Sequence, residues 1–288
     1  MRKLIMCIAV YFVTGLSGNN AASAAETVST AETVLANYIK RLYNELAFDK
    51  GAPLSFEVFN KAYRGYLNLK TADRLSEDKD ILTVCDFTQS SNKDRMWVID
   101  LKEKKVLFNT YVAHGAATGE EFATKFSNNF ESHQSSLGFY VTGETYTGEH
   151  GNSLRLHGMD YGFNHNAFDR AIVMHGADYV SKQFIKGNER LGRSWGCPAV
   201  SNQLAQPIIN TIKGGTCLFI YYPDKNYLKS GQWLNKKPES IPQFVTDDMQ
   251  NMLLSSKGKP AAKKKPQLPV KVEYDKSMIP NFYMVLPL

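Results

Sequence analysis

The spacing of hydrophobic positions changes once along the chain, near residue 80. Before that point apolar residues recur every three or four positions in two segments, as on the buried face of an amphipathic helix. The first set is Val34, Leu35, Tyr38, Ile39, Leu42, Tyr43 and Leu46, and the second is Phe56, Phe59, Ala62, Tyr63 and Tyr66. Ser29 and Glu32 have capping-box spacing, and Gly51-Ala52-Pro53 separates the segments. The pattern predicts one helix beginning near Ser29 and another beginning near Ser55.

From Ile81 onward the period is two, which is typical of strands. Runs rich in β-branched and aromatic residues occupy 81–87, 95–101, 105–113, 137–142, 153–157, 171–175 and 216–222. The short polar linker 102–105 predicts a hairpin between the second and third runs. Residues 201–213 return to helical spacing, with Leu204, Ile208, Ile209 and Ile212 as the apolar face. We therefore expect a mostly β body, preceded by two helices and containing a few short ones.

The first 24 residues have the composition of an export signal. Arg2 and Lys3 precede an apolar stretch, and Ala22-Ser23-Ala24 is a small-residue cleavage site. Cleavage there predicts secretion across the inner membrane, to the periplasm or the cell wall; an uncleaved N-terminal anchor is the alternative. No later segment approaches the roughly 20 apolar residues of a spanning helix, so we expect no integral membrane span in the mature chain.

Composition shifts suggest four parts of the chain. They are a signal peptide (1–24), a helical segment (25–79), a mostly β body (80–235) and an extension (236–288). Residues 257–266 of the extension form a basic, Pro- and Ala-rich linker. Lysine and arginine number 34 against 28 acidic residues. This excess is small and scattered, which argues against a nucleic-acid partner and remains compatible with an anionic wall polymer or a membrane surface.

Three cysteines remain after the predicted signal, and an odd number leaves at least one thiol free or paired with another molecule. Cys85 and Cys217 lie in strand-like runs, where a buried small hydrophobe is expected. Cys197 lies instead in the loop Gly192-Arg193-Ser194-Trp195-Gly196-Cys197-Pro198. A thiol in such a loop becomes a strong nucleophile when an imidazole or a positive charge favours its thiolate. His175, followed by Gly176 at the end of an apolar run, is the candidate base.

These residues resemble the L,D-transpeptidase catalytic domain family, whose signature is a His-Gly followed by a loop and Ser-x-Gly-Cys. Further stretches are similar to a divergent branch found in Bacteroidetes-like bacteria, and the resemblance covers about residues 80–222. Those stretches are Val112-Ala113-His114-Gly115, Phe126-Ser127-Asn128, Ser135-Ser136-Leu137-Gly138-Phe139-Tyr140 and Ser194-Trp195-Gly196-Cys197-Pro198-Ala199-Val200. The family fold implied is a β-sandwich.

The resemblance implies an enzyme that acts on peptidoglycan stem peptides without a cofactor. Cys197 would attack the carbonyl before the terminal D-alanine of a tetrapeptide stem and form a thioester, with His175 as the base. The N–H groups of Gly196 and Cys197 would stabilise the oxyanion. An amine from a neighbouring stem would resolve the thioester. If water resolved the thioester instead, the enzyme would be an L,D-carboxypeptidase. A further alternative is a catalytically silent module that binds the cell wall.

Several residues around the expected site have two interpretations. His157-Gly158 repeats the His-Gly pattern, so His157 is the rival base, although we expect it to line the substrate cleft; His114-Gly115 is a third copy, expected at a strand end. Trp195 could form a wall of the cleft or pack against the rest of its loop. Ser194 could orient the site by a hydrogen bond or stabilise the turn, and Gly176 is expected to shape the site.

One departure from the family concerns substrate binding. Typical members have Arg or Asn two residues after the cysteine, where this chain has Ala199. Arg193, or less favourably Arg190, could supply a guanidinium for a stem-peptide carboxylate, with a solvated loop arginine as the alternative. A zinc site built from His157, His175, Asp178 and Cys197 lacks any known metal-ligand spacing, so no metal is predicted.

Overall fold

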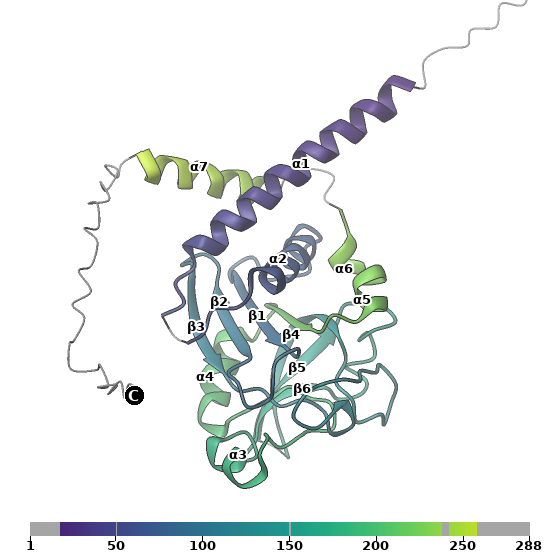
Figure 1. Ribbon diagram of the computed structural model, residues 1–288, viewed down its shortest axis with the longest axis vertical. Helices are drawn as coiled ribbons and strands as arrows, with labels where there is room; N and C mark the ends of the chain where they lie inside the picture. Colours follow the sequence, from purple (N-terminus) through teal and green to yellow (C-terminus); the bar gives the residue numbers. More distant parts are fainter. Residues whose placement is uncertain (1–17, 50, 150, 238–241, 258–288) are drawn as a thin grey trace, which may run out of the picture. The chain divides into compact units, whose positions relative to one another are not determined.

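The structure is a computed structural model that describes residues 18–49, 51–149, 151–237 and 242–257. The chain divides into one compact unit that ends at Gln243 and a second that begins at Phe244 (Figure 1). The second unit contains most of helix α7 (Gln243–Lys257). Residues 1–17 of the predicted signal peptide and residues 258–266 of the basic linker lie outside the described residues. The expected boundaries at residues 24, 79 and 235 stay a prediction.

Eight strands form the body of the first unit, in the order β3-β2-β1-β8-β4-β5-β6-β7 (Figure 1). They are β1 (Ile81–Asp86), β2 (Met96–Asp100), β3 (Lys105–Thr110), β4 (Gly138–Gly148), β5 (Gly151–Gly158), β6 (Val173–Gly176), β7 (Ala199–Val200) and β8 (Cys217–Tyr221). Neighbours are antiparallel except for the parallel pairs β1–β8 and β6–β7. The predicted mostly β fold class is confirmed, and so are the seven predicted strands and the hairpin of β2 and β3. The two-residue strand β7 is too short to give a periodic signal.

Helix α1 (Gly18–Glu45) begins eleven residues before the predicted start at Ser29. The preceding stretch is rich in alanine, the strongest helix former, so Ser29 and Glu32 lie inside the helix instead of capping it. Helix α2 (Phe56–Thr71) begins as predicted, since the Ser55 hydroxyl accepts a hydrogen bond from the Val58 N–H at 3.3 Å.

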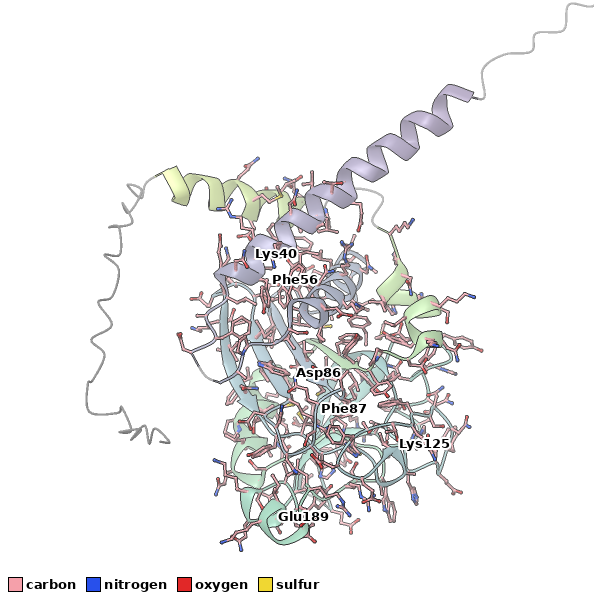
Figure 2. The ribbon with its side chains drawn as sticks, viewed as in Figure 1. Lys40, Phe56, Asp86, Phe87, Lys125 and Glu189 are labelled. Carbon is pink, nitrogen blue, oxygen red and sulfur yellow. The ribbon has the colours of Figure 1, made fainter. Side chains whose placement is uncertain are left out.

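The two helices meet each other and the sheet within one compact unit. The Lys40 ammonium of α1 lies 4.1 Å from the ring centroid of Phe56, at the start of α2 (Figure 2). Gly65 of α2 faces the Phe139 ring of β4 so closely that an added Cβ would lie 1.9 Å from it. Phe139 in turn stacks on Phe219 of β8 with ring centroids 4.1 Å apart. The helical segment therefore covers the centre of the sheet.

Shorter helices follow the later strands. They are the 3-10 turn η1 (Ala116–Thr118), α3 (Lys182–Asn188), α4 (Asn202–Ile212), α5 (Lys225–Ser230) and α6 (Gln232–Asn235). Helix α4 matches the predicted one, and Ile208, Ile209 and Ile212 of its expected apolar face are buried. The buried Asp160 carboxylate joins α5 and α6 to the sheet, because it accepts hydrogen bonds from the Phe139 N–H, the Trp233 N–H and the Tyr227 hydroxyl. In the described part of the chain, no helix has the length and apolar character needed to cross a membrane.

Candidate active site

Strand pairing brings the predicted nucleophile and base to neighbouring segments of backbone. His175 of β6 is the register partner of Ala199 of β7, and Cys197 precedes Ala199 by two residues. The Cys197 sulfur lies 3.4 Å from the backbone nitrogen of Val173 and 3.7 Å from the carbonyl oxygen of Ala171. The thiol is thus beside the start of β6, two residues before the imidazole on the same strand.

The cysteine turn depends on a glycine before the nucleophile. Gly196 has a φ of +123°, and an added Cβ would lie 2.7 Å from the carbonyl oxygen of Gln134. Ser194 closes the turn: its hydroxyl donates to the Cys197 carbonyl at 2.7 Å and accepts the Gly196 N–H at 3.1 Å. Of the two interpretations of Ser194, the structure therefore supports stabilisation of the turn.

The same contact changes the expected oxyanion site. Because the Gly196 N–H donates to Ser194 within the turn, this amide is already engaged. The Cys197 N–H interacts with its own sulfur and lowers the pKa of the thiol. The Gly196 N–H would therefore have to leave the Ser194 hydroxyl before it could donate to an oxyanion formed at the thiol.

The Cys197 thiol is half-buried, and its ionisation is balanced by opposing effects. Burial raises the pKa of the thiol, whereas the Val173 N–H, the positive charge of Arg170 and the Cys197 N–H lower it. A thiol whose pKa stays above its ordinary value is protonated at neutral pH. It therefore needs a base for efficient attack on a carbonyl.

His175 is buried, with 2% of its surface exposed. Its Nδ1 atom lies 2.9 Å from the carbonyl oxygen of Gly176. If Nδ1–H donates to this carbonyl, the neutral ring carries its basic lone pair on Nε2. Gly176 also allows α4 to approach, since a Cβ there would lie 2.5 Å from Oδ1 of Asn202. Gly176 thus shapes the site both through its carbonyl and through its missing side chain.

The other two His-Gly histidines have different surroundings. The His157 ring on β5 stacks against Phe168, with centroids 4.9 Å apart. His114 is 1% exposed, and its Nδ1 lies 2.8 Å from the Arg95 guanidinium. Burial and the charge of Arg95 lower its pKa to about 3. The His114 carbonyl accepts the Ser194 N–H at 3.0 Å, so this residue supports the cysteine turn through its backbone.

The arginines expected to bind a substrate carboxylate are occupied by a carboxylate of the chain itself. Arg193 forms an ion pair with Glu120 and donates to the carbonyls of Ala116 and Gly119 at 3.2 and 3.1 Å. Arg190 contacts the same Glu120 carboxylate at 2.8 Å. A substrate carboxylate would have to compete with Glu120 for Arg193.

Trp195 is 75% exposed, and its ring stacks on His133 with centroids 4.8 Å apart. It therefore presents part of its ring to solvent two residues before Cys197. Its role at the wall of a cleft stays a prediction.

Arg170 is a residue that the sequence analysis missed. It is half-buried and precedes Ala171, whose carbonyl contacts the Cys197 sulfur. Its guanidinium donates four hydrogen bonds to acceptors between residues 127 and 136. A lone arginine in a polar loop carries no periodic or motif signal, so only the three-dimensional contacts reveal it.

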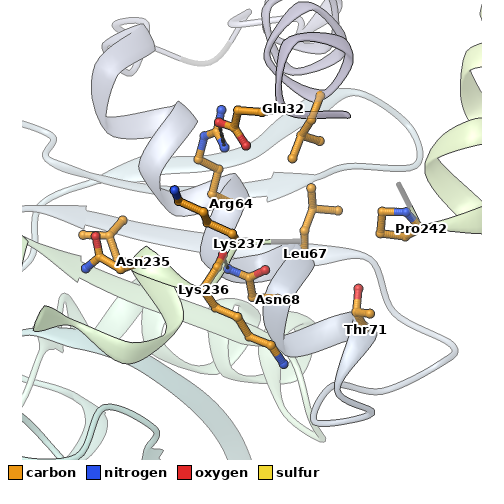
Figure 3. A pocket seen from close by; sticks show the side chains of 11 residues that line it. Glu32, Arg64, Leu67, Asn68, Thr71, Asn235, Lys236, Lys237 and Pro242 are labelled. Atoms are coloured by element: carbon orange, nitrogen blue, oxygen red, sulfur yellow. Dashed lines mark hydrogen bonds and ion pairs between the residues drawn. The ribbon is translucent and has the colours of Figure 1, made fainter. Parts of the chain in front are cut away.

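A cavity of about 720 Å³ lies away from these residues, between α1, α2 and the segment after α6 (Figure 3). Leu35 and Leu67 contribute apolar surface. Arg64 and Glu32, which also line the cavity, form an ion pair at 2.6 Å (Figure 3). No group of three or more His, Cys, Asp or Glu side chains able to hold a metal ion occurs among the described residues.

A cysteine beside a strand-borne histidine defines the site as one suited to acyl transfer. The profile of the L,D-transpeptidase catalytic domain family matches residues 50–221, a range that holds Cys197, His175 and the whole sheet. The chain belongs to this family. The family resemblance drawn from the sequence is confirmed, while its assignment to a Bacteroidetes-like branch stays a prediction. No curated protein matches the chain.

The solved structures that match the chain are distant from it in sequence. An L,D-transpeptidase from Mycobacterium smegmatis is 13% identical with a TM-score of 0.30, and the alignment covers 50% of this chain and 59% of that protein. The helical cell shape determining protein Pgp2 from Campylobacter jejuni is 14% identical with a TM-score of 0.33, over 50% of this chain and 48% of that protein. An L,D-transpeptidase from Xylanimonas cellulosilytica is 12% identical with a TM-score of 0.28, and the alignment covers 68% of this chain and 93% of that protein. The aligned part thus spans about half of the first two proteins.

Proposed function

We propose that the protein is an exported peptidoglycan L,D-transpeptidase that acts through a thioester on Cys197. The thiolate attacks the carbonyl of the bond that joins the stem diamino acid to the terminal D-alanine. The C–N bond breaks, D-alanine leaves with a proton from the imidazolium of His175, and the acyl group stays on sulfur. An amine of a neighbouring stem then displaces the thiolate and forms the crosslink.

The observation that carries this proposal is the family match, which includes a cysteine turn whose thiol lies against the strand of His175. The buried imidazole fits the role of base because its Nδ1 contact with Gly176 favours a basic Nε2. The Cys197 amide is proposed as the oxyanion donor because it belongs to the residue whose sulfur attacks the carbonyl. The signal-like first 24 residues support export to the periplasm or wall, where the substrate polymer lies.

The test is release of D-alanine from purified tetrapeptide stems. We expect Cys197→Ser to abolish release without altering thermal unfolding, since a serine hydroxyl is a far weaker nucleophile than a thiolate. His175→Ala should reduce kcat by at least about a hundredfold, the lower end for loss of an acid–base group. His157→Ala is the matched control and should retain most of the activity. Equal activity in Cys197→Ser would refute the thioester, and a greater loss in His157→Ala would transfer the base role to His157.

The products separate this function from its two alternatives. Mass spectrometry of wall fragments incubated with the enzyme should detect crosslinked dimers when an acceptor stem is present. Tripeptide stems without dimers would instead identify an L,D-carboxypeptidase that uses the same residues. A protein that binds wall fragments, releases no D-alanine and leaves Cys197 unreactive towards iodoacetamide would be a silent wall-binding module.

A further inference from the structure

Arg170 makes its hydrogen bonds to a single loop, Ser127–Ser136. One terminal nitrogen, Nη1, donates to the Ser127 carbonyl at 3.0 Å and to the Ser136 hydroxyl at 2.5 Å. The other, Nη2, donates to the Ser132 hydroxyl at 3.1 Å and to the Gln134 carbonyl at 2.8 Å. Because the guanidinium is planar and both terminal nitrogens donate to the loop, these hydrogen bonds fix the shape of the loop.

That loop is packed directly on the cysteine turn. The Ser135 hydroxyl donates to the Gly196 carbonyl at 3.0 Å and accepts the Gly115 N–H at the same distance. The Gln134 carbonyl oxygen lies 2.7 Å from the position that a Cβ on Gly196 would take, and the His133 ring stacks on Trp195. Any movement of the loop is therefore transmitted to the residue before the nucleophile.

Among the residues that the structure describes, no carboxylate forms an ion pair with Arg170. Its four acceptors are carbonyl and hydroxyl oxygens, all uncharged. Partial burial weakens screening by water, so the positive charge acts on groups nearby. Cys197 is one of these groups. Burial raises the pKa of the thiol and Arg170 lowers it; burial lowers the pKa of Arg170, and the charges of Tyr140 and Cys197 raise it.

The other titratable groups around the thiol do not supply a fixed charge. Burial raises the pKa of Tyr179 well above its ordinary value, so this phenol is neutral at physiological pH. His175 on β6 is the proposed base, whose charge changes during the reaction. Arg170 remains protonated throughout.

We propose that Arg170 is a positioning residue for Cys197, which holds the Ser127–Ser136 loop against the cysteine turn and supplies positive charge next to the thiolate. The role in catalysis rests on the proposed transpeptidase function, whereas the role in thiol ionisation does not depend on any substrate.

The experiment measures alkylation of Cys197 by iodoacetamide, a small neutral reagent, as a function of pH, followed by peptide mass spectrometry. The thiolate displaces iodide to form an S–C bond, so the rate reports the thiolate fraction. In Arg170→Met we expect the thiol pKa to rise by about one unit and alkylation below that pKa to slow about tenfold. Arg170→Lys should keep the pKa close to that of the wild type, because it keeps the charge.

The positioning role is read from D-alanine release by the same proteins. Arg170→Lys loses the fork geometry, so we expect its kcat to fall about tenfold or more while its thiol pKa stays unchanged. Arg155→Met is the matched control: Arg155 is a partly exposed arginine of β5 that pairs with Glu144 at 2.9 Å, and its removal should change neither measurement. If Arg170→Met does not fold, Arg170→Gln removes the charge and keeps a polar side chain at this position.

An alkylation profile in a folded Arg170→Met or Arg170→Gln variant that equals the wild-type profile would overturn the electrostatic role. Wild-type kcat in Arg170→Lys would overturn the positioning role. If the wild-type protein itself releases no D-alanine, the proposed function fails, and the alkylation profiles still decide whether Arg170 favours the thiolate.

Discussion

Lowering the pH from 7 to 5 should destabilise the protein through the buried pair of His114 and Arg95. Both side chains are fully buried, and Arg95 also donates to the Val112 carbonyl through Nε and Nη2 at 3.1 and 2.9 Å. With a cation 2.8 Å away, the imidazole accepts a hydrogen bond and stays neutral. The folded-state pKa of His114 is about 3, well below its ordinary 6.5.

The sign and size of the effect follow from proton binding. Between these two values the unfolded chain binds a proton at His114 and the folded chain does not, so stability is full above pH 6.5 and falls as the pH decreases. One pKa unit corresponds to about 1.4 kcal/mol. From pH 7 to pH 5 the contribution of this histidine therefore falls by about 2 kcal/mol.

Urea unfolding at pH 7, 6 and 5 measures this loss, and His114→Gln is the comparison variant. Its amide oxygen can accept from Arg95 but does not titrate, so its free energy of unfolding should decrease by about 2 kcal/mol less than that of the wild type. The remaining five histidines are common to both proteins. Equal decreases in the two proteins, or an NMR titration of the His114 ring between pH 5 and 7, would refute the assignment.

Three further predictions concern the site and the core. Gly196→Ala should lower the free energy of unfolding by about 2 kcal/mol or more and abolish D-alanine release, because an alanine at φ +123° is strained and meets the Gln134 carbonyl. Gly187→Ala, where an added Cβ meets nothing within 4 Å, is its control and should be tolerated in both assays. Asp160→Ala should cost about 3 kcal/mol in urea unfolding by leaving buried donors without an acceptor, and a loss below about 1 kcal/mol would contradict this. A carbapenem, whose strained carbonyl is open to thiolate attack, should raise the whole-protein mass by one drug molecule, and an equal increase in Cys197→Ser would show that another residue reacts.

The strands could be predicted closely because alternation of apolar and polar residues is a local signal. Every predicted run overlaps a strand, and Cys85 and Cys217 are buried as expected. The start of α1 was wrong, since the capping-box spacing at Ser29 competes with an alanine-rich stretch that extends the helix towards the N-terminus.

The candidate site was predictable only where residues belong to a motif. His175 and Cys197 could be paired from their His-Gly and Gly-Cys contexts. The engagement of Arg193 by Glu120 and of the Gly196 amide by Ser194 depends on side-chain orientations that spacing does not encode. Arg170 acts through a loop distant in sequence, a contact that a pattern of single residues cannot contain.

The position of β8 has a consequence for how the protein acquires its activity. This last strand lies between β1 and β4 and is the element that joins the β3-β2-β1 group to the β4-β5-β6-β7 group. Leu82 pairs with Cys217, so the contact closes a loop of well over a hundred residues, which is a slow step in folding. A chain emerging from a ribosome or a translocon can form the early hairpin at once, yet it cannot unite the two halves until β8 has emerged. The cysteine turn would then reach its final structure late, after most of the polypeptide has emerged.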